Sequence, residues 1–267
     1  MNTEHPYWHQ QSLEKPLFPD IEWSKPEHKS RRGRLGIIGG NKLGFTSVAE
    51  SYTVALQAGA GEVKVILPDI LKKSIPTTMT DVIYGASNPS GGLASNAITQ
   101  MKSAADWATE IMLIGDAGRN SETAILYENF VHEYHGPLVI TRDAIDLLKN
   151  DSSTLVDRPN TLLIASFAQL QKLFQIVYYP KVLTFSMQLT NLVEAIHKFT
   201  ISYQVSLAVF HKDMMLVASG GEVTSTPWPN PMEIWQGKTA TIAAVYWLWN
   251  PSKPLESVTA SLLQNMS

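Results

Sequence analysis

The amino-acid sequence predicts an α/β fold: a doubly wound, mostly parallel β-sheet with helices on both faces. Residues 33–67 contain a buried strand, a glycine turn, an amphipathic helix and a second strand in one continuous unit. Further along the chain, short apolar runs alternate with segments of helical periodicity. Because parallel strands are joined through crossover helices, this alternation favours a mostly parallel sheet.

The first strand ends at an open loop. An apolar run at residues 35–38 stops at Gly39, Gly40 and Asn41. Glycine adopts positive φ and allows close backbone approach at little cost, so the chain can turn sharply here. Turns at the carboxyl ends of parallel strands face ligands, and we therefore expect a ligand-facing turn at residues 39–46.

The segment that follows has the pattern of an amphipathic helix. Apolar residues recur at spacings of three and four over residues 46–58, with Thr46 or Ser47 available as N-cap. Gly59 is expected to end this helix, and the apolar run at residues 63–67 to return as a strand that is covered on both faces. The unit reads as a βαβ crossover.

The remaining elements are predicted by the same periodicities. Later strands are expected at residues 111–114, 138–141, 161–165, 205–210 and 214–218, and later helices at residues 121–132, 143–149, 167–175 and 238–249. The loops at residues 39–46, 115–120 and 236–238 should then converge on one cleft, since parallel strands deliver their carboxyl ends to the same edge.

Length and composition indicate one domain with an arm before it. The chain has 267 residues, of which 44% are hydrophobic, enough for one sizeable core. Residues 1–32 carry four prolines and scattered aromatics, which predict an extended arm held down by Trp8, Phe18 and Trp23. Residues 33–267 are expected to form a single domain.

Charge and composition also exclude several classes of function. The absence of cysteine rules out disulfides, thiolate metal sites and cysteine nucleophiles. A net charge of −3 argues against nonspecific binding of nucleic acid. Neither a membrane-spanning run nor a signal-peptide pattern is present, so a cytoplasmic location is expected. His132 and His135 lack further ligands at metal-site spacing, and no metal site is expected.

The glycine spacing excludes the two commonest phosphate loops. Gly39, Gly40 and Gly44 do not fit Gly-x-Gly-x-x-Gly, and Lys42 is not followed by the Gly-Lys-Ser/Thr of a P-loop. The segment instead resembles the start of the ADP- or ATP-dependent NAD(P)H-hydrate dehydratases, which belong to the ribokinase-like superfamily. The matching elements are His28-Lys29, Gly33-Arg34, the strand at residues 35–38, Gly39-Gly40, Phe45-Thr46 and Ala58-Gly59-Ala60-Gly61.

Later motifs of the family are present only in outline. Gly115 and Gly118 resemble its Gly-Pro-Gly-Leu-Gly loop, although Asp116 and Ala117 replace two of its residues. The strand at residues 138–141 leads to a segment similar to Asp-Ala-Asp-Ala-Leu, in which Asp143 keeps the second aspartate and Thr141 replaces the first. The family's Thr-Pro-His-Pro-Gly-Glu would fall at residues 164–169, where none of its six residues is found.

The catalytic turn of the family has no counterpart. Its Gly-Ser/Thr-Gly-Asp opens a buried helix, where backbone N–H groups hold phosphate and the aspartate is the general base. Matched to the helix at residues 238–249, the motif meets Trp235 and Gln236, and a glutamine carboxamide takes no proton. Trp235 is expected to obstruct the close backbone approach to phosphate. The family's Lys-Gly after a late strand meets His211 and Lys212.

The resemblance implies binding residues at the sheet edge. Residues expected to contact a substrate are Gly39, Gly40, Asn41, Phe45, Thr46 and Asp143, and those expected to contact ADP or ATP are Gly115, Gly118, Lys212, Gly237 and Lys238. No catalytic residue is assigned, because Gln236 occupies the general-base position.

Three functions therefore remain open. The first is a divergent, catalytically impaired dehydratase-like protein, or pseudoenzyme, that binds a nucleotide or related ligand. The second is a working nucleotide-dependent NAD(P)H-hydrate dehydratase, a lyase of metabolite repair that uses other residues. The third is a ribokinase-like small-molecule kinase, and the missing aspartate weakens this hypothesis in the same way.

Association with a second copy is expected from the aromatic side chains. Apolar residues occupy most of the circumference of the helix at residues 238–249, so that one face would pack on the sheet and the other would need cover. The aromatic set is Trp228, Trp235, Tyr246, Trp247 and Trp249, which suits a core or a subunit interface, or alternatively stacking on a ligand ring. We expect a homodimer or larger assembly.

Overall fold

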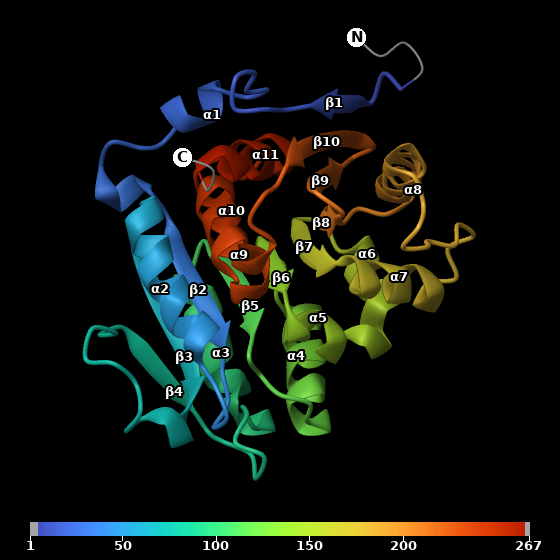
Figure 1. Ribbon diagram of the computed structural model, residues 1–267. Helices are drawn as coiled ribbons and strands as arrows, with labels where there is room; N and C mark the ends of the chain where they lie inside the picture. Colours follow the sequence, from blue (N-terminus) through green and yellow to red (C-terminus); the bar gives the residue numbers. More distant parts are fainter. Residues whose placement is uncertain (1–4, 265–267) are drawn as a thin grey trace.

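The computed structural model describes residues 5–264 as one ten-stranded β-sheet with helices on both faces (Figure 1). The strand order is β1-β10-β9-β8-β7-β6-β5-β2-β3-β4. Every strand and helix predicted from the periodicities is found close to its expected bounds, and the helix predicted at residues 46–58 matches to the residue. The predicted α/β fold with a doubly wound sheet is confirmed.

The strands of the sheet are short. Their bounds are β1 Trp8–Gln10, β2 Arg34–Gly39, β3 Glu62–Pro68, β4 Val82–Gly85, β5 Glu110–Gly115, β6 Leu138–Thr141, β7 Thr161–Ser166, β8 Ser206–His211, β9 Met214–Ser219 and β10 Glu222–Pro227.

The helices connect and cover these strands. Their bounds are α1 Asp20–Trp23, α2 Thr46–Ala58, α3 Ile98–Trp107, α4 Ser121–Glu133, α5 Asp143–Leu147, α6 Ser152–Asp157, α7 Phe167–Ile176, α8 Leu189–Ser202, α9 Pro231–Gln236, α10 Lys238–Trp249 and α11 Pro254–Gln264.

The central strands are parallel and end at one edge. Strands β4, β3, β2, β5, β6, β7 and β8 pair in parallel in that spatial order, whereas β9 and β10 return antiparallel. The register of β2 and β5 shifts between Ile38 and Gly39, which sets Gly39 opposite Gly115. Because the carboxyl ends of parallel strands lie together, the loops after β2, β5 and β6 are neighbours.

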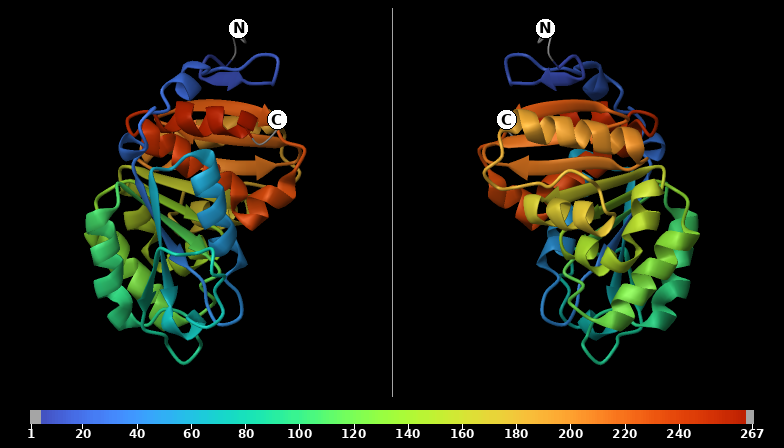
Figure 2. Two further views of the ribbon diagram at one scale, coloured as in Figure 1. Left: turned by 90° about the vertical axis from the view of Figure 1, so that its left-hand side faces the viewer. Right: turned by 90° about the vertical axis from the view of Figure 1, so that its right-hand side faces the viewer.

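Two hydrophobic layers cover the two faces of the sheet. Side chains of α2, α10 and α11 form one buried cluster with alternate residues of the strands, such as Ile37 and Met112. Side chains of α3 to α8 form the other cluster, with residues such as Ile38 and Leu113. The period of two along each strand sends neighbouring residues to opposite clusters, and Figure 2 shows the helices on either side of the sheet.

The segment before β2 is only partly the extended arm that its prolines predict. Strand β1 adds to the edge of the sheet in parallel with β10, and the indole Nε1 of Trp8 donates to Ser225 Oγ at 2.9 Å. Two short helical turns, α1 and the 3₁₀ turn Lys29–Arg31, interrupt it. Phe18 is partly buried against the core, but Trp23 is 87% exposed, so the expectation that Trp23 anchors the arm is wrong.

Helix α10 is covered within the chain itself. It packs against α2, α11 and the sheet, and Tyr246 and Trp247 are fully buried. Trp228 is also buried, whereas Trp235 is about half exposed. The apolar circumference of α10 therefore needs no second copy to cover it, and this premise of the association argument is wrong. Self-association itself stays a prediction.

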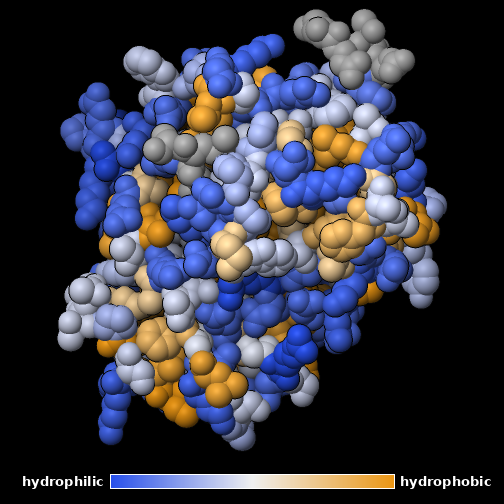
Figure 3. Space-filling model, in the orientation of Figure 1, coloured by the Kyte–Doolittle hydropathy of each residue, from blue (hydrophilic) through white to orange (hydrophobic). Residues whose placement is uncertain are grey.

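The surface seen in Figure 3 carries hydrophobic side chains in several separate patches among hydrophilic ones. Exposed apolar residues come from many elements, among them Leu43, Tyr178 and Val182. Within residues 5–264, no helix has both the length and the apolar character needed to cross a membrane.

The close contact of β2 with β5 can be tested by adding one methyl group. A Cβ at Gly39 would lie 2.3 Å from the carbonyl oxygen of Gly115, so we expect Gly39→Ala to lower the free energy of unfolding by roughly 1–3 kcal/mol. Gly44→Ala is the control, because a Cβ there meets nothing within 4 Å, and it should stay within about 0.5 kcal/mol of the original. Equilibrium urea denaturation measures both; equal stability of the two variants would contradict the packing described here.

Candidate functional site

The candidate site lies where β2, β5 and β6 end. The loop after β2 contacts the loop after β5 through the backbone, since Gly40 N–H donates to Gly115 O at 2.9 Å. The junction of α9 and α10 joins them: a Cβ at Gly237 would lie 2.7 Å from Ile114 Cδ1 and 3.7 Å from Arg142 Cδ. The three loops predicted to converge therefore do so.

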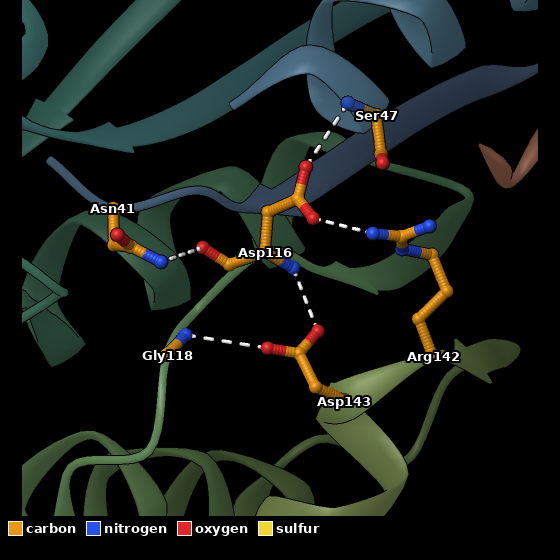
Figure 4. A network of polar contacts seen from close by, with 6 residues as sticks. All are labelled: Asn41, Ser47, Asp116, Gly118, Arg142 and Asp143. Carbon is orange, nitrogen blue, oxygen red and sulfur yellow. Dashed lines mark hydrogen bonds and ion pairs between the residues drawn. The ribbon is translucent and has the colours of Figure 1, made fainter. Parts of the chain in front are cut away.

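Asp116 links these loops at the centre of the network in Figure 4. Its Oδ1 accepts from Arg142 Nη2 at 2.5 Å, and its Oδ2 accepts from the backbone N–H of Ser47 at 3.0 Å. Its carbonyl oxygen accepts from Asn41 Nδ2. One residue of the β5 loop thus binds the β2 loop, the first turn of α2 and the residue that follows β6.

This arrangement corrects the predicted cap of α2. Phe45, rather than Thr46 or Ser47, occupies the N-cap position, and no side chain of its own segment caps the helix. Asp116 accepts the N–H of the second helical residue instead, from 69 positions further along the chain. A carboxylate at a helix N-terminus also interacts favourably with the helix dipole.

Asp143 fills the backbone turn of the β5 loop. Its Oδ1 accepts from the N–H of Asp116 at 2.7 Å and its Oδ2 from the N–H of Gly118 at 3.2 Å. Successive N–H groups in such a turn form an anion-binding concavity, and here a carboxylate of the chain occupies it. Burial raises the pKa of Asp143 above its ordinary value, and the nearby Asp116 adds to that rise, while the two N–H donors and Arg142 oppose it.

Two residues of the network have backbones in the left-handed region. Asp116 has φ of 52° and Arg142 has φ of 57° with ψ of −142°. Conformations of this kind cost a non-glycine residue about 1–3 kcal/mol and persist where the surroundings hold them. The ion pair between the two side chains is one such constraint, because it is mostly shielded from solvent.

The guanidinium of Arg142 has a hydrogen-bond donor without a partner. Its Nη2 binds Asp116, whereas its Nε is buried and has no hydrogen-bond partner among the described residues. Since a buried donor without a partner is costly, this atom marks a position where an acceptor is missing. It belongs to the side chain whose Cδ lies beside Gly237, at the start of α10.

The junction of α9 and α10 occupies the place of the expected catalytic turn. Gly237, with φ of 88°, ends α9 and begins α10. Gln236 is the last residue of α9 and is exposed. The residue at the junction is therefore glycine, and the expectation that Trp235 obstructs the backbone there is not supported, because Trp235 lies within α9 with 49% of its surface exposed.

A carboxylate also lies at this junction. Glu233 Oε1 accepts from Lys238 Nζ at 3.0 Å, while its Oε2 is buried and unpartnered in the described part of the chain. Lys238, expected to contact a nucleotide, is thus bound by an acid five residues before it. Glu233 stands in proline-rich sequence without a Gly-x-Gly-Asp context, which is why the motif comparison gave it no role.

The other predicted site residues are divided between this edge and its surroundings. Asn41, Gly115, Gly118 and Asp143 meet in the network, and Phe45 and Thr46 begin α2 beside it. Lys212 lies apart, in the turn after β8, with φ of 58° and its Nζ donating to Met187 O at 3.2 Å. Among residues 5–264, no hydrogen bond or ion pair joins Lys212 to the network.

Two hollows flank the network in place of the single cleft expected from the sequence. One, of about 450 Å³, lies between α2 and the α9–α10 junction and is lined by residues such as Glu50, Gln236 and Lys238. The other, of about 580 Å³, lies beside Gly118 and is shared by α4 and α5. Neither is lined by all three loops. Within residues 5–264 no group of three or more acidic or histidine side chains is placed to hold a metal ion.

The sheet edge has donors that can bind an anion, but its acidic side chains are already bound to donors of the chain. Asp116 is bound to Arg142 and Ser47, Asp143 to two N–H groups, and Glu233 to Lys238. A general base must reach the proton that it removes, and these partners compete for the same oxygens. Arg142 and Asp116 were not assigned any role from the sequence; the available signals were that Arg142 replaces an alanine and Asp116 a proline of the family's motifs.

Comparison by sequence bears out the resemblance read from the motifs. The chain is 27% identical over 155 residues to a bifunctional NAD(P)H-hydrate repair enzyme of Methanothermobacter thermautotrophicus, a match that covers 57% of this chain and 30% of that protein. The matched part is thus less than a third of the relative's length. No protein-family model matches the chain.

Comparison by structure identifies the fold. A ribokinase-like superfamily protein of Enterococcus faecalis superposes with a TM-score of 0.72 at 14% identity, covering 100% of this chain and 89% of that one. An ADP/ATP-dependent NAD(P)H-hydrate dehydratase of Bacillus subtilis, co-crystallised with ATP and Mg²⁺ and soaked with CoA, superposes with a TM-score of 0.59 at 13% identity, covering 92% and 85%. The chain has the ribokinase-like fold and is similar in sequence to an NAD(P)H-hydrate repair enzyme.

Proposed function

We propose that this protein is a divergent NAD(P)H-hydrate dehydratase-like protein that binds a nucleotide or a related phosphorylated ligand at the sheet edge and does not dehydrate NAD(P)H hydrates. The observation that carries the proposal is Arg142, whose buried Nε has no acceptor at the start of α10. A phosphate oxygen is the acceptor that a guanidinium binds best.

The position of Arg142 suits a phosphate for two further reasons. Gly237 has no side chain to fill the space beside Arg142 Cδ, and helix α10 begins at the next residue. The N-terminus of a helix favours negative charge, so it would act together with the guanidinium. The nucleotide class itself is taken from the relatives, one of which was crystallised with ATP and Mg²⁺.

Loss of the dehydration reaction follows from the missing base. Gln236 is exposed and carries no ionisable oxygen, while Asp116 and Asp143 are each bound through both oxygens and Glu233 is bound to Lys238 through one. A positioned general base contributes about 10²- to 10⁴-fold to a rate. A small-molecule kinase of this fold would face the same deficit.

Ligand binding is tested by titration of the protein with ADP, ATP, NADH, NADPH and the two hydrates, followed by thermal shift and calorimetry. We expect a nucleotide to stabilise the fold, by about 2.7 kcal/mol at a hundred times its Kd. Arg142→Gln should weaken binding roughly 10- to 100-fold, since hydrogen bonds to charged groups contribute about 1.5–3 kcal/mol. Asp116→Asn should strengthen it, because Arg142 is released from its ion pair.

The matched control is Arg31→Gln, an exposed arginine in the short turn before β2, which should leave binding unchanged. Opposite effects of the Arg142 and Asp116 substitutions distinguish loss of an anion contact from general loss of structure. Failure of every nucleotide to stabilise the protein, or equal binding by all four proteins, would overturn the proposal.

A working dehydratase is the second candidate, and Glu233 is the observation in its favour. Its free oxygen lies buried beside Lys238 at the start of α10, near the place where the family's general base is expected. A carboxylate with one unpartnered oxygen can take a proton if a substrate brings one within reach.

Catalysis is tested by following the repair of NADH hydrate with ADP or ATP, together with ADP release in the presence of small alcohols. We expect no turnover, and none after Gln236→Asp alone, because Gln236 lies in α9 outside the first turn of α10. Rates on the order of 1 per second or more would refute the proposal. In that case Glu233→Gln should reduce the rate about 10²- to 10⁴-fold, whereas Glu222→Gln on β10 should not.

A further inference from the structure

The hollow of about 580 Å³ beside α4 adjoins the sheet-edge network and shares Gly118 and Asp143 with it. It is a groove lined by one face of α4 and, opposite, by α5, the turn that follows it and α7; Figure 1 shows where these helices lie. Its volume lies within the range of small-molecule sites, about 300–1,000 Å³. Arg142, Gly237 and Glu233 do not line it.

The lining of the groove includes apolar side chains from both helices. Ala124 and Ile125 of α4 and Leu147 of α5 all line it, together with the loop before α4. Further along α4, His132 Nε2 lies 3.0 Å from Asp151 Oδ2 and joins this helix to the turn after α5. A flat apolar group of a ligand would pack between these walls.

Glu128 places an unused acceptor in the groove. Its Oε1 is buried and has no hydrogen-bond partner in residues 5–264, although the residue as a whole is half-buried. Because a buried carboxylate oxygen without a donor costs free energy, a ligand that offers an N–H or O–H group would be favoured here.

Cationic side chains border the same groove. Neither Arg119, in the loop before α4, nor Lys149, on the far wall, forms an ion pair or side-chain hydrogen bond anywhere in the described chain. A third cation, Lys172, forms an ion pair with Asp146, with 3.5 Å between Nζ and Oδ1. The groove therefore offers positive charge for an anionic group as well as the acceptor on Glu128.

We propose that this groove binds an amino-bearing nucleoside monophosphate, with the phosphate at Arg119 and the base amine at Glu128. The groove extends along α4 from Arg119, in the loop before the helix, to Glu128, and the seven residues from Ser121 to Glu128 alone give a rise of about 10 Å. An adenine nucleotide carries its phosphate and its exocyclic amine at opposite ends, so it can span this length with its base against Ala124, Ile125 and Leu147.

The test is calorimetric titration of the full chain with AMP, IMP and adenosine. IMP replaces the amine by a carbonyl oxygen, which repels Glu128, and adenosine lacks the phosphate. We expect AMP to bind at least 10-fold more tightly than either. Glu128→Gln should abolish the preference for AMP over IMP, since the carboxamide can donate to the carbonyl. Arg119→Gln should weaken both nucleotides to the same extent.

Two control variants separate this groove from other sites. Glu133→Gln, on the same helix but paired with Lys102, should bind AMP and IMP as the original does. Arg142→Gln separates the two sites: it should weaken nucleotide binding at the sheet edge, and if it also abolished the preference for AMP over IMP, that preference would belong to the sheet edge and the groove proposal would be overturned. The proposal is overturned if AMP does not bind, or if the preference for AMP survives Glu128→Gln.

Discussion

Asp116 is the residue on which the geometry of the sheet edge depends. It follows β5, and with both carboxylate oxygens and its backbone it holds the β2 loop, the start of α2 and the residues after β6. An ion pair of this kind contributes little when exposed, but breaking one in a partly buried place leaves a charge without a partner. The strained backbones of Asp116 and Arg142 persist because these contacts hold them.

The parallel strands and their helices could be predicted because their patterns are local. Glycine after a periodic run ends α2 at Ala58, and Gly59 indeed takes a left-handed conformation there. The cap of α2 could not be predicted, because it comes from Asp116, far along the chain. Local patterns also did not reveal that α2 and α11 bury α10, since burial on all sides by the same chain and burial by a partner have the same sequence pattern.

The location of the candidate site could be predicted from the sequence, but its side-chain contacts could not. The loops after β2 and β5 meet because topology requires it. The motif comparison set Glu233 aside because its sequence context lacks the glycines of the motif, but α9 brings this residue beside Lys238. Arg142 occupies a position that is alanine in the motif, and its significance depends on a buried Nε that only the structure shows.

Several charged groups at the sheet edge are paired within the chain. In an anion-binding loop, N–H groups are free to donate to a ligand. Here Asp143 accepts from two such N–H groups, and Asp116 forms an ion pair with Arg142. These carboxylates stabilise the sheet edge, because they satisfy donors that would otherwise be buried without acceptors. A ligand must then compete with the chain's own acids, except at the Nε of Arg142. The stability of this edge and the binding of an anion therefore depend on the same few donors, because the chain's own carboxylates and an anionic ligand would compete for them.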